Sequence, residues 1–223
     1  MYLAFFIIGA LDLLDALKTS TTESERNGYI EWIYHCQHPH GGFRMWSGTD
    51  FGDLASDANA KWDPANIPAT YFALALLLML GDDFKRVRRR QTLQWLRRMQ
   101  RSDGSFGETL VDGRIEGGRD PRFSYCATGI RFMLRGKHGS DLTIDGEIIE
   151  DIELDGLVEC IRQAQVGKLY TSQTCRTPLT IGLQAFDGGI ADEPFHEPHA
   201  GYTFCSLGAL KFVDRLKIGR AHV

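Results

Sequence analysis

Two side chains that could take part in chemistry stand at the starts of apolar segments. Arg122 opens one of these segments, where a buried arginine would be costly without a partner. The simplest alternative is an exposed ion pair with Asp120 or Glu116. His199 stands before Ala-Gly-Tyr-Thr-Phe, and taken alone it is typical of a helix cap or a core histidine. The elements that hold these two residues must therefore decide what they do.

Acidic pairs and cysteines do not by themselves predict a metal site. Asp82 and Asp83 resemble half of an acidic magnesium motif, but no second acidic cluster follows at a suitable spacing, so they indicate an ordinary turn. The five cysteines are odd in number, lack a Cys-x-x-Cys pairing and mostly lie in apolar contexts. They are typical of reduced thiols in a cytosolic protein.

A repeated phrase predicts the architecture. An apolar pair leads to a glutamine, Gln37 or Gln100, and then to a glycine turn at 40–43 or 103–106 with the same spacing in both copies. A third glycine turn follows at 187–190 after a disturbed stretch. A unit that cannot bury its own apolar face must stack on copies of itself, so the repeat predicts a solenoid or a closed ring.

Each copy combines an amphipathic helix with a more apolar one. The apolar helices are expected at Thr70–Leu80, Tyr125–Leu134 and Tyr202–Leu210, and Gly81 is expected to stop the first. The basic run 85–101 is interpreted as the solvated face of an outer helix rather than a nucleic-acid patch. Inner apolar helices that alternate with outer charged ones describe an all-α fold, an α/α barrel.

Composition fits one globular domain. The chain has 223 residues, 43% of them hydrophobic, and its net charge of −4 implies no nucleic-acid partner. No segment has the length of apolar sequence that a membrane span needs. The N-terminal apolar stretch lacks a basic leader and is followed at once by Asp12 and Asp15. It is expected to form a core helix from Leu3 to Leu17 rather than a signal peptide.

Several phrases together carry a specific resemblance. They are Ala4–Phe6, Leu11–Asp15, Glu31–Tyr34, Leu80–Asp83, Asp103–Phe106, Arg122–Ala127 and His199–Cys205. In order and spacing they resemble the β subunit of protein prenyltransferases over most of residues 2–210. The phrases at 80–83 and 122–127 are most similar to the geranylgeranyltransferase type I group, and the segment 187–201 looks fungal.

The resemblance implies an α6–α6 barrel, or α/α toroid, with an aromatic-lined cavity for an isoprenoid diphosphate. It implies a cytoplasmic enzyme paired with a prenyltransferase α subunit. That enzyme would transfer a geranylgeranyl group from geranylgeranyl diphosphate to the cysteine of CaaX-terminated small GTPases. It also implies a zinc ion that activates this thiol. Because charge develops on the departing diphosphate, donor side chains around it are where electrostatic catalysis should act.

The resemblance also implies roles for particular residues. His199 matches the family histidine that contacts the diphosphate. The positions that match the isoprenoid channel are Tyr2, Arg122, Tyr125, Gly201, Tyr202 and Cys205. The positions that match the peptide-binding site are Arg122, for the terminal carboxylate, and Asn66, Pro68 and Phe123, for the last side chain. The structural alternative for the aromatic and small residues is plain core packing.

Two of these positions depart from the family pattern. Tyr2 is larger than the small residue that geranylgeranyl enzymes carry there, whereas farnesyl enzymes carry a bulky residue that shortens the channel. Asn66 stands where histidine is common, which leaves the preference for the last peptide residue open.

Two stretches do not fit the fold. Removing 166–184 restores the repeat offsets in the third copy, so these 19 residues are interpreted as a retained in-frame intron or, alternatively, a surface insertion. The tail 217–223 resembles a translated sequencing adapter. We therefore expect a single domain over 1–216, a barrel incomplete at both ends, and zinc ligands beyond the present C-terminus. This expectation assigns no metal ligand to the chain and predicts that it is inactive alone.

Other functions stay open. Within the same family, the chain could serve a farnesyl or a Rab-type prenyltransferase. Terpene cyclases have repeats with similar Gln-x-x-Asp-Gly phrases, but the chain lacks their Asp-x-Asp-Asp motif. A non-catalytic α/α toroid used only for binding is the alternative from a different class.

Overall fold

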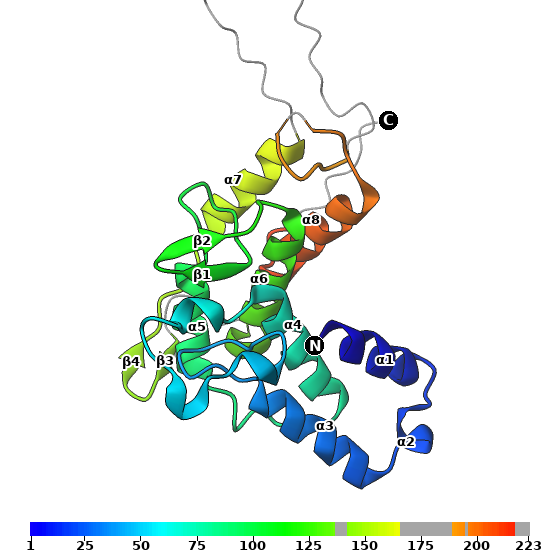
Figure 1. Cartoon of the computed structure of the whole chain (residues 1–223). Coiled ribbons are helices and arrows are strands. Elements are labelled where there is room, and N and C mark those ends of the chain that lie inside the picture. The colour runs from blue at the N-terminus through cyan, green and yellow to red at the C-terminus, as the bar shows by residue number, and fades with distance from the viewer. Residues whose placement is uncertain (137–141, 166–188, 195, 217–223) are drawn as a thin grey trace, which may run out of the picture.

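The computed structural model describes residues 1–136, 142–165, 189–194 and 196–216. One row of helices, called the inner helices below, consists of α1 (Tyr2–Leu13), α4 (Ile67–Met79), α6 (Pro121–Arg135) and α8 (Ala200–Phe212). These four contact one another in series, α1 on α4, α4 on α6 and α6 on α8. A second row, called the outer helices, consists of α3 (Glu23–His35), α5 (Arg89–Arg98) and α7 (Leu154–Gln165). Figure 1 shows the two rows side by side, with α1 and α8 at the ends of the first. The arrangement confirms the predicted α/α toroid architecture.

Helix α4 forms where the sequence predicts an apolar helix. Asn66 caps its start by accepting a hydrogen bond from the Ala69 amide, and Pro68 occupies the first turn, where no amide is needed. Gly81 follows the C-terminal cap with φ +82°, a conformation that favours glycine. Most of the helix is buried, as expected for an element between two helical neighbours.

The expected core helix from Leu3 to Leu17 is wrong in extent and in burial. Helix α1 ends at Leu13, and Asp15 adopts a left-handed conformation with φ +53° that breaks the helix before the short α2 (Leu17–Ser20). Ile8 is buried, but Leu13 is 89% exposed. The physical reason is that α1 packs mainly on α4, so only the side of α1 that faces α4 is covered.

The basic run forms the exposed side of α5 and the loop before it, as predicted. Arg86 pairs with Glu31, and Arg97 pairs with Glu153. On the opposite side of α5 a buried stripe includes Trp95. These two arginines are therefore paired with acidic side chains, one on α3 and one just before α7.

Each repeat glutamine clamps the start of the next outer helix. Gln37 accepts a hydrogen bond from the Arg88 amide (2.7 Å) and donates one to the Arg86 carbonyl (3.1 Å). Gln100 accepts from the Glu153 amide (2.7 Å) and donates to the Glu153 carbonyl (2.9 Å). The glutamine of the repeat is therefore a structural residue that joins one hairpin to the next.

The glycine turns dock against the same outer helices. A Cβ at Gly41 would lie 2.3 Å from the Gln91 carbonyl oxygen, and a Cβ at Gly104 would lie 2.0 Å from the Gly156 carbonyl oxygen. Both glycines also have positive φ, +100° and +86°. Close approach and conformation together require glycine at these two positions.

Two short hairpins and three 3-10 turns complete the connections. Strands β1 (Thr109–Val111) and β2 (Arg114–Glu116) pair antiparallel, as do β3 (Thr143–Ile144) and β4 (Glu147–Ile148). Both hairpins turn on an Asp-Gly pair with positive φ at both residues. The 3-10 turns are Ser47–Thr49, Gly52–Leu54 and Ala60–Trp62.

The third copy closes like the first across a longer stretch of chain. In copy one, the Arg44 amide donates to the Cys36 carbonyl eight residues earlier (2.7 Å). In copy three, the Ala191 amide donates to the Ala164 carbonyl 27 residues earlier (3.3 Å). The difference is 19 residues, the length of the segment 166–184. That segment, the turn residues 187–188 and the tail 217–223 lie outside the described residues.

Candidate functional site

The inner helices begin at three equivalent positions that face the candidate site. Asn66, Asp120 and His199 are the N-terminal caps of α4, α6 and α8, and each side chain accepts a backbone hydrogen bond. In the first and third copies the backbone confirms the match. The Asn66 amide donates to the Phe43 carbonyl (3.0 Å), and the His199 amide donates to the Ile190 carbonyl (3.2 Å). The predicted site residues Asn66, Arg122 and His199 thus lie at the N-terminal ends of three successive helices.

The caps fix the register between the inner helices. Counted from the caps, the residue equivalent to Tyr125 is Phe204, not Tyr202. The ring centroids of Tyr71 and Tyr125 are 5.4 Å apart, and those of Tyr125 and Phe204 are 5.7 Å apart. Tyr202 lies one turn earlier, with its ring 5.2 Å from that of His199. One aromatic residue from each inner helix therefore forms a continuous wall.

Glycines on the next helix make room for this wall. A Cβ at Gly129 would lie 2.5 Å from the Tyr71 ring, and a Cβ at Gly208 would lie 2.6 Å from the Tyr125 ring. The Tyr71 hydroxyl donates to the Tyr125 hydroxyl (3.2 Å). Burial and this hydrogen bond raise the pKa of Tyr71, so its phenol stays protonated at physiological pH.

Tyr2 extends the wall to α1. Its ring lies edge-on to Phe72 with centroids 5.1 Å apart, and the Phe72 ring lies 5.5 Å from Tyr71. Burial raises the pKa of Tyr2 to about 12, and the charge of Glu108 adds to the shift. The side chain is thus a neutral, partly buried donor at the α1 end of the aromatic wall.

His199 is a helix cap, one of the roles that the sequence alone allowed. Its Nδ1 accepts a hydrogen bond from the Gly201 amide (3.0 Å). In a neutral imidazole an accepting Nδ1 places the proton on Nε2, so the exposed ring offers an N–H donor at the start of α8. A Cβ at Gly201 would lie only 3.0 Å from Nδ1, so this glycine keeps space for the ring.

Arg122 is exposed and paired rather than buried. Its Nε and Nη2 both donate to Asp120 Oδ2, at 2.8 and 2.5 Å, and its backbone amide donates to Asp120 Oδ1. The ion pair that the sequence left open is therefore formed. The guanidinium carbon also lies 5.8 Å from the centre of the Tyr202 ring. Arg122 thus presents a positive charge beside Tyr202, and contact with a peptide carboxylate stays a prediction.

Cys126 lies on α6 and Cys205 on α8, and both are close enough to Arg122 to be affected by its charge. Burial raises the pKa of Cys126 and of Cys205, and the nearby Arg122 lowers both in part. These thiols are therefore protonated packing groups rather than nucleophiles. Cys205 is partly buried close to the Arg122–Asp120 pair, a position that suits a wall residue.

The predicted pocket for the last peptide residue contains a carboxylate that the sequence analysis missed. Asn66 Nδ2 donates to Glu108 Oε1 (2.9 Å), and the Ile67 amide donates to the Glu108 carbonyl (2.9 Å). Pro68 is buried and Phe123 is partly buried against the core. The available signal was a glutamate placed two residues after the apolar residue that ends the second glycine turn.

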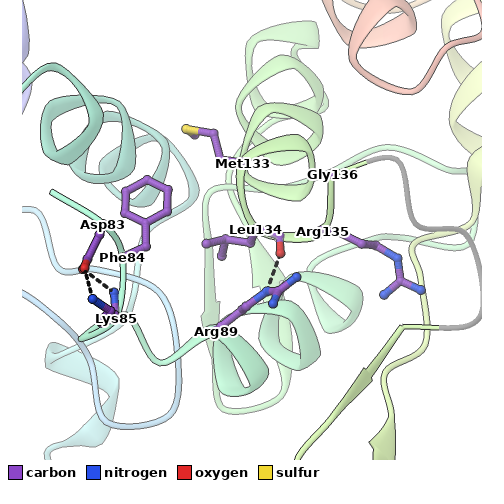
Figure 2. A pocket seen from close by; sticks show the side chains of 8 residues that line it. All are labelled: Asp83, Phe84, Lys85, Arg89, Met133, Leu134, Arg135 and Gly136. Carbon is purple, nitrogen blue, oxygen red and sulfur yellow. Dashed lines mark hydrogen bonds and ion pairs between the residues drawn. The ribbon is translucent and has the colours of Figure 1, made fainter. Parts of the chain in front are cut away.

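Two cavities lie away from these residues. One, of about 410 Å³, lies at the C-terminal end of α6, between Met133–Gly136 and the loop Asp83–Lys85. Figure 2 shows Asp83 paired with Lys85 there and Arg89 donating to the Leu134 carbonyl. The other, of about 810 Å³, lies under the loop 44–65. Neither is lined by a predicted site residue.

Within the described ranges, no group of three or more histidine, cysteine, aspartate or glutamate side chains is placed to hold a metal ion. The described residues therefore do not fit a zinc ion, and no chemical step is assigned to one. None of the described helices is long and apolar enough to cross a bilayer.

The family model for the prenyltransferase alpha-alpha toroid domain matches residues 1–222. The chain belongs to this family. It is 27% identical to the geranylgeranyl transferase type-1 subunit beta of Dictyostelium discoideum, over 97% of this chain and 56% of that protein. It is 24% identical to the Arabidopsis thaliana protein of the same name, over 97% and 50%. A farnesyltransferase subunit beta from Pisum sativum is 25% identical, over 98% and 41%.

A solved structure shows the same fold. It is Candida albicans protein geranylgeranyltransferase-I complexed with GGPP, with a TM-score of 0.70 and 22% identity. The match covers 94% of this chain and 51% of that chain. The chain thus spans about half the length of the relatives it matches. These comparisons confirm the resemblance to prenyltransferase β subunits, including the type I geranylgeranyl group.

Proposed function

We propose that this chain is part of the β subunit of a heterodimeric protein prenyltransferase in the cytoplasm. The enzyme transfers a geranylgeranyl group from geranylgeranyl diphosphate to the cysteine of CaaX-terminated small GTPases. The observation that carries the proposal is the exposed imidazole of His199, whose Nδ1 accepts from the Gly201 amide at the start of α8, beside a wall of aromatic side chains. The family membership and the named relatives support the same reaction.

The aromatic wall suits the isoprenoid tail. Tyr71, Tyr125 and Phe204 present ring faces and edges from three successive helices. A branched, unsaturated hydrocarbon gains contact area on such a wall and has no polar group for which the wall must supply a partner. Tyr202 continues this surface toward His199.

The start of α8 suits the diphosphate. Free amides and the helix dipole favour an anion at a helix N-terminus, and His199 adds a side-chain donor at the same place. In the transfer, the cysteine thiol gives up its proton to solvent, and its sulfur forms a bond to the first isoprenoid carbon while the carbon–oxygen bond breaks and its electron pair leaves with the diphosphate. A donor at His199 Nε2 stabilises the charge that grows on that oxygen.

Farnesyl transfer is the second candidate, and Tyr2 favours it. The Tyr2 ring packs edge-on to Phe72 and fills space at the α1 end of the wall, where a longer tail would run. Tyr2→Thr should therefore shift the donor preference toward the twenty-carbon diphosphate. A preference that does not change would place the end of the channel elsewhere.

The test uses the protein encoded by the full-length transcript, co-expressed with a prenyltransferase α subunit. We expect mass spectrometry to show one isoprenoid added to a peptide that ends in Cys-a-a-X. A peptide with serine in place of the cysteine is the matched control. A folded heterodimer that transfers neither a geranylgeranyl nor a farnesyl group to the cysteine peptide would contradict the proposal. That result would favour an α/α toroid used only for binding.

A further inference from the structure

Backbone hydrogen bonds hold Glu108 beside Asn66, in the predicted pocket for the last peptide residue. Its amide donates to the Glu116 carbonyl (2.8 Å), and its carbonyl accepts from the Ile67 amide (2.9 Å). The side chain is partly buried, and Oε1 accepts from Asn66 Nδ2 (2.9 Å). Within the described residues Oε2 has no hydrogen-bond donor, so one carboxylate oxygen is available to a ligand.

The orientation of Asn66 fixes which partner it can offer. Its Oδ1 accepts from the Ala69 amide (2.8 Å) as the cap of α4. The amide nitrogen must then point the other way, toward an acceptor, and Glu108 supplies that acceptor. The Asn66–Glu108 pair therefore places a carboxylate acceptor at the start of α4.

We infer that Glu108 selects the last residue of the peptide substrate and favours a side chain that donates a hydrogen bond, such as glutamine or serine. The inference rests on the proposed function and names the substrate class of the same site. An apolar side chain such as leucine would remove water from the free carboxylate oxygen without replacing that partner, which is unfavourable.

The charges around the site give the peptide one orientation. Glu108 and Arg122 both lie close enough to the Tyr2 phenol to affect its ionisation. Glu108 raises the pKa of Tyr2, and Arg122 lowers it. The peptide carboxylate is attracted to Arg122 and repelled by Glu108, so the last side chain, not the carboxylate, faces Glu108. A glutamate at the last position should be the poorest substrate.

The experiment compares four peptides that differ only in the last residue, which is glutamine, serine, leucine or glutamate. With the heterodimer described above, we expect kcat/KM for glutamine and serine to exceed that for leucine by about tenfold or more, because a site that hydrogen-bonds its substrate rejects an analogue without the donor. Glu108→Leu should reverse this ranking. Glu116→Leu, an exposed glutamate in the same hairpin, should keep it.

A wild-type preference for leucine would overturn the inference while leaving the proposed function intact. If no peptide is modified, the proposed function fails and the inference fails with it. Glu108→Gln keeps the size of the side chain and removes its charge, so it covers the case in which Glu108→Leu does not fold. In that variant we expect the glutamate-ending peptide to gain about tenfold relative to the others, and no gain would overturn the inference.

Discussion

The glycine turns and the caps of the inner helices each recur at equivalent places in successive repeats. The first two turns are nearly the same, whereas the caps differ. The turns at 40–43 and 103–106 keep the same backbone hydrogen bonds and the same close approach to the next outer helix. The caps are three different residues, Asn66, Asp120 and His199, that perform one capping role. We call the glycine turns that contact the next outer helix the joints of the repeat. The difference teaches that the repeat keeps these joints constant and varies the residues that face the site.

The largest expected effect breaks a joint. Gly104→Ala should destabilise the fold by about 2–5 kcal/mol, because a Cβ would collide with the Gly156 carbonyl at a backbone with φ +86°. Gly81→Ala is the matched control, with φ +82° and no atom within 4 Å of the added Cβ. Thermal and denaturant unfolding should show a loss of about 1–2 kcal/mol for the control. Equal losses would contradict the role of the joint.

The second prediction separates the two turns by pH. Burial and the nearby Arg44 lower the pKa of His38 from 6.5 to about 4, whereas the equivalent residue of the second turn is Arg101. Between these pH values the unfolded chain binds a proton at His38 that the folded chain does not. Stability should therefore fall as the pH drops through this window, by about 2 kcal/mol after allowance for partial exposure.

Unfolding curves at pH 7 and pH 4.5 measure this loss. His38→Gln should reduce the difference between the two curves, whereas His40→Gln, the exposed neighbour, should leave it unchanged. An undiminished difference in His38→Gln would show that other groups carry the acid sensitivity.

The third prediction concerns Arg122, which pairs with Asp120, the cap of α6. Arg122→Ala should raise KM for the CaaX peptide by about tenfold with little change in kcat, because a charged hydrogen bond to the carboxylate is lost from binding. Arg119→Ala removes an exposed arginine that pairs with Asp103 in the second glycine turn, and should leave KM unchanged. An unaltered KM in Arg122→Ala would limit Arg122 to its ion pair with Asp120.

The smallest effect is expected where the third joint carries extra chain. Deleting 166–184 should keep the hydrogen bond between Ala191 and Ala164 and stabilise the fold by about 1 kcal/mol, since a shorter loop costs less entropy to close. Reverse-transcription PCR should show a transcript shorter by 19 codons. If every transcript retains the segment, it is a surface insertion and not an intron.

Sequence patterns predict the joints and the buried helices well because both depend on local chemistry. The run 70–80 has no polar face, so its burial follows directly. The Asp112-Gly113 and Asp145-Gly146 hairpins carry an equally local signal that the sequence analysis did not use. For α1 the prediction is wrong because its exposure depends on which helices lie beside it, which composition does not reveal.

The candidate site is less predictable because it depends on register between helices. The match of Tyr125 to Phe204 rather than Tyr202 follows from the position of the His199 cap, and apolar residues alone tolerate either register. Glu108 escapes notice because it lies in a connection, and its proximity to Asn66 arises only when the hairpin docks on α4.

The most direct test asks whether capping and chemistry separate at His199. Serine caps helices well but cannot reach as an imidazole does, so His199→Ser should keep the melting temperature near that of the wild type. Turnover should fall roughly a hundredfold or more, since one donor to a leaving oxyanion is worth about 2.7–4 kcal/mol. His199→Ala should show the same loss of turnover and a further loss of about 1 kcal/mol in stability. Full turnover in a stable His199→Ser heterodimer would contradict the account.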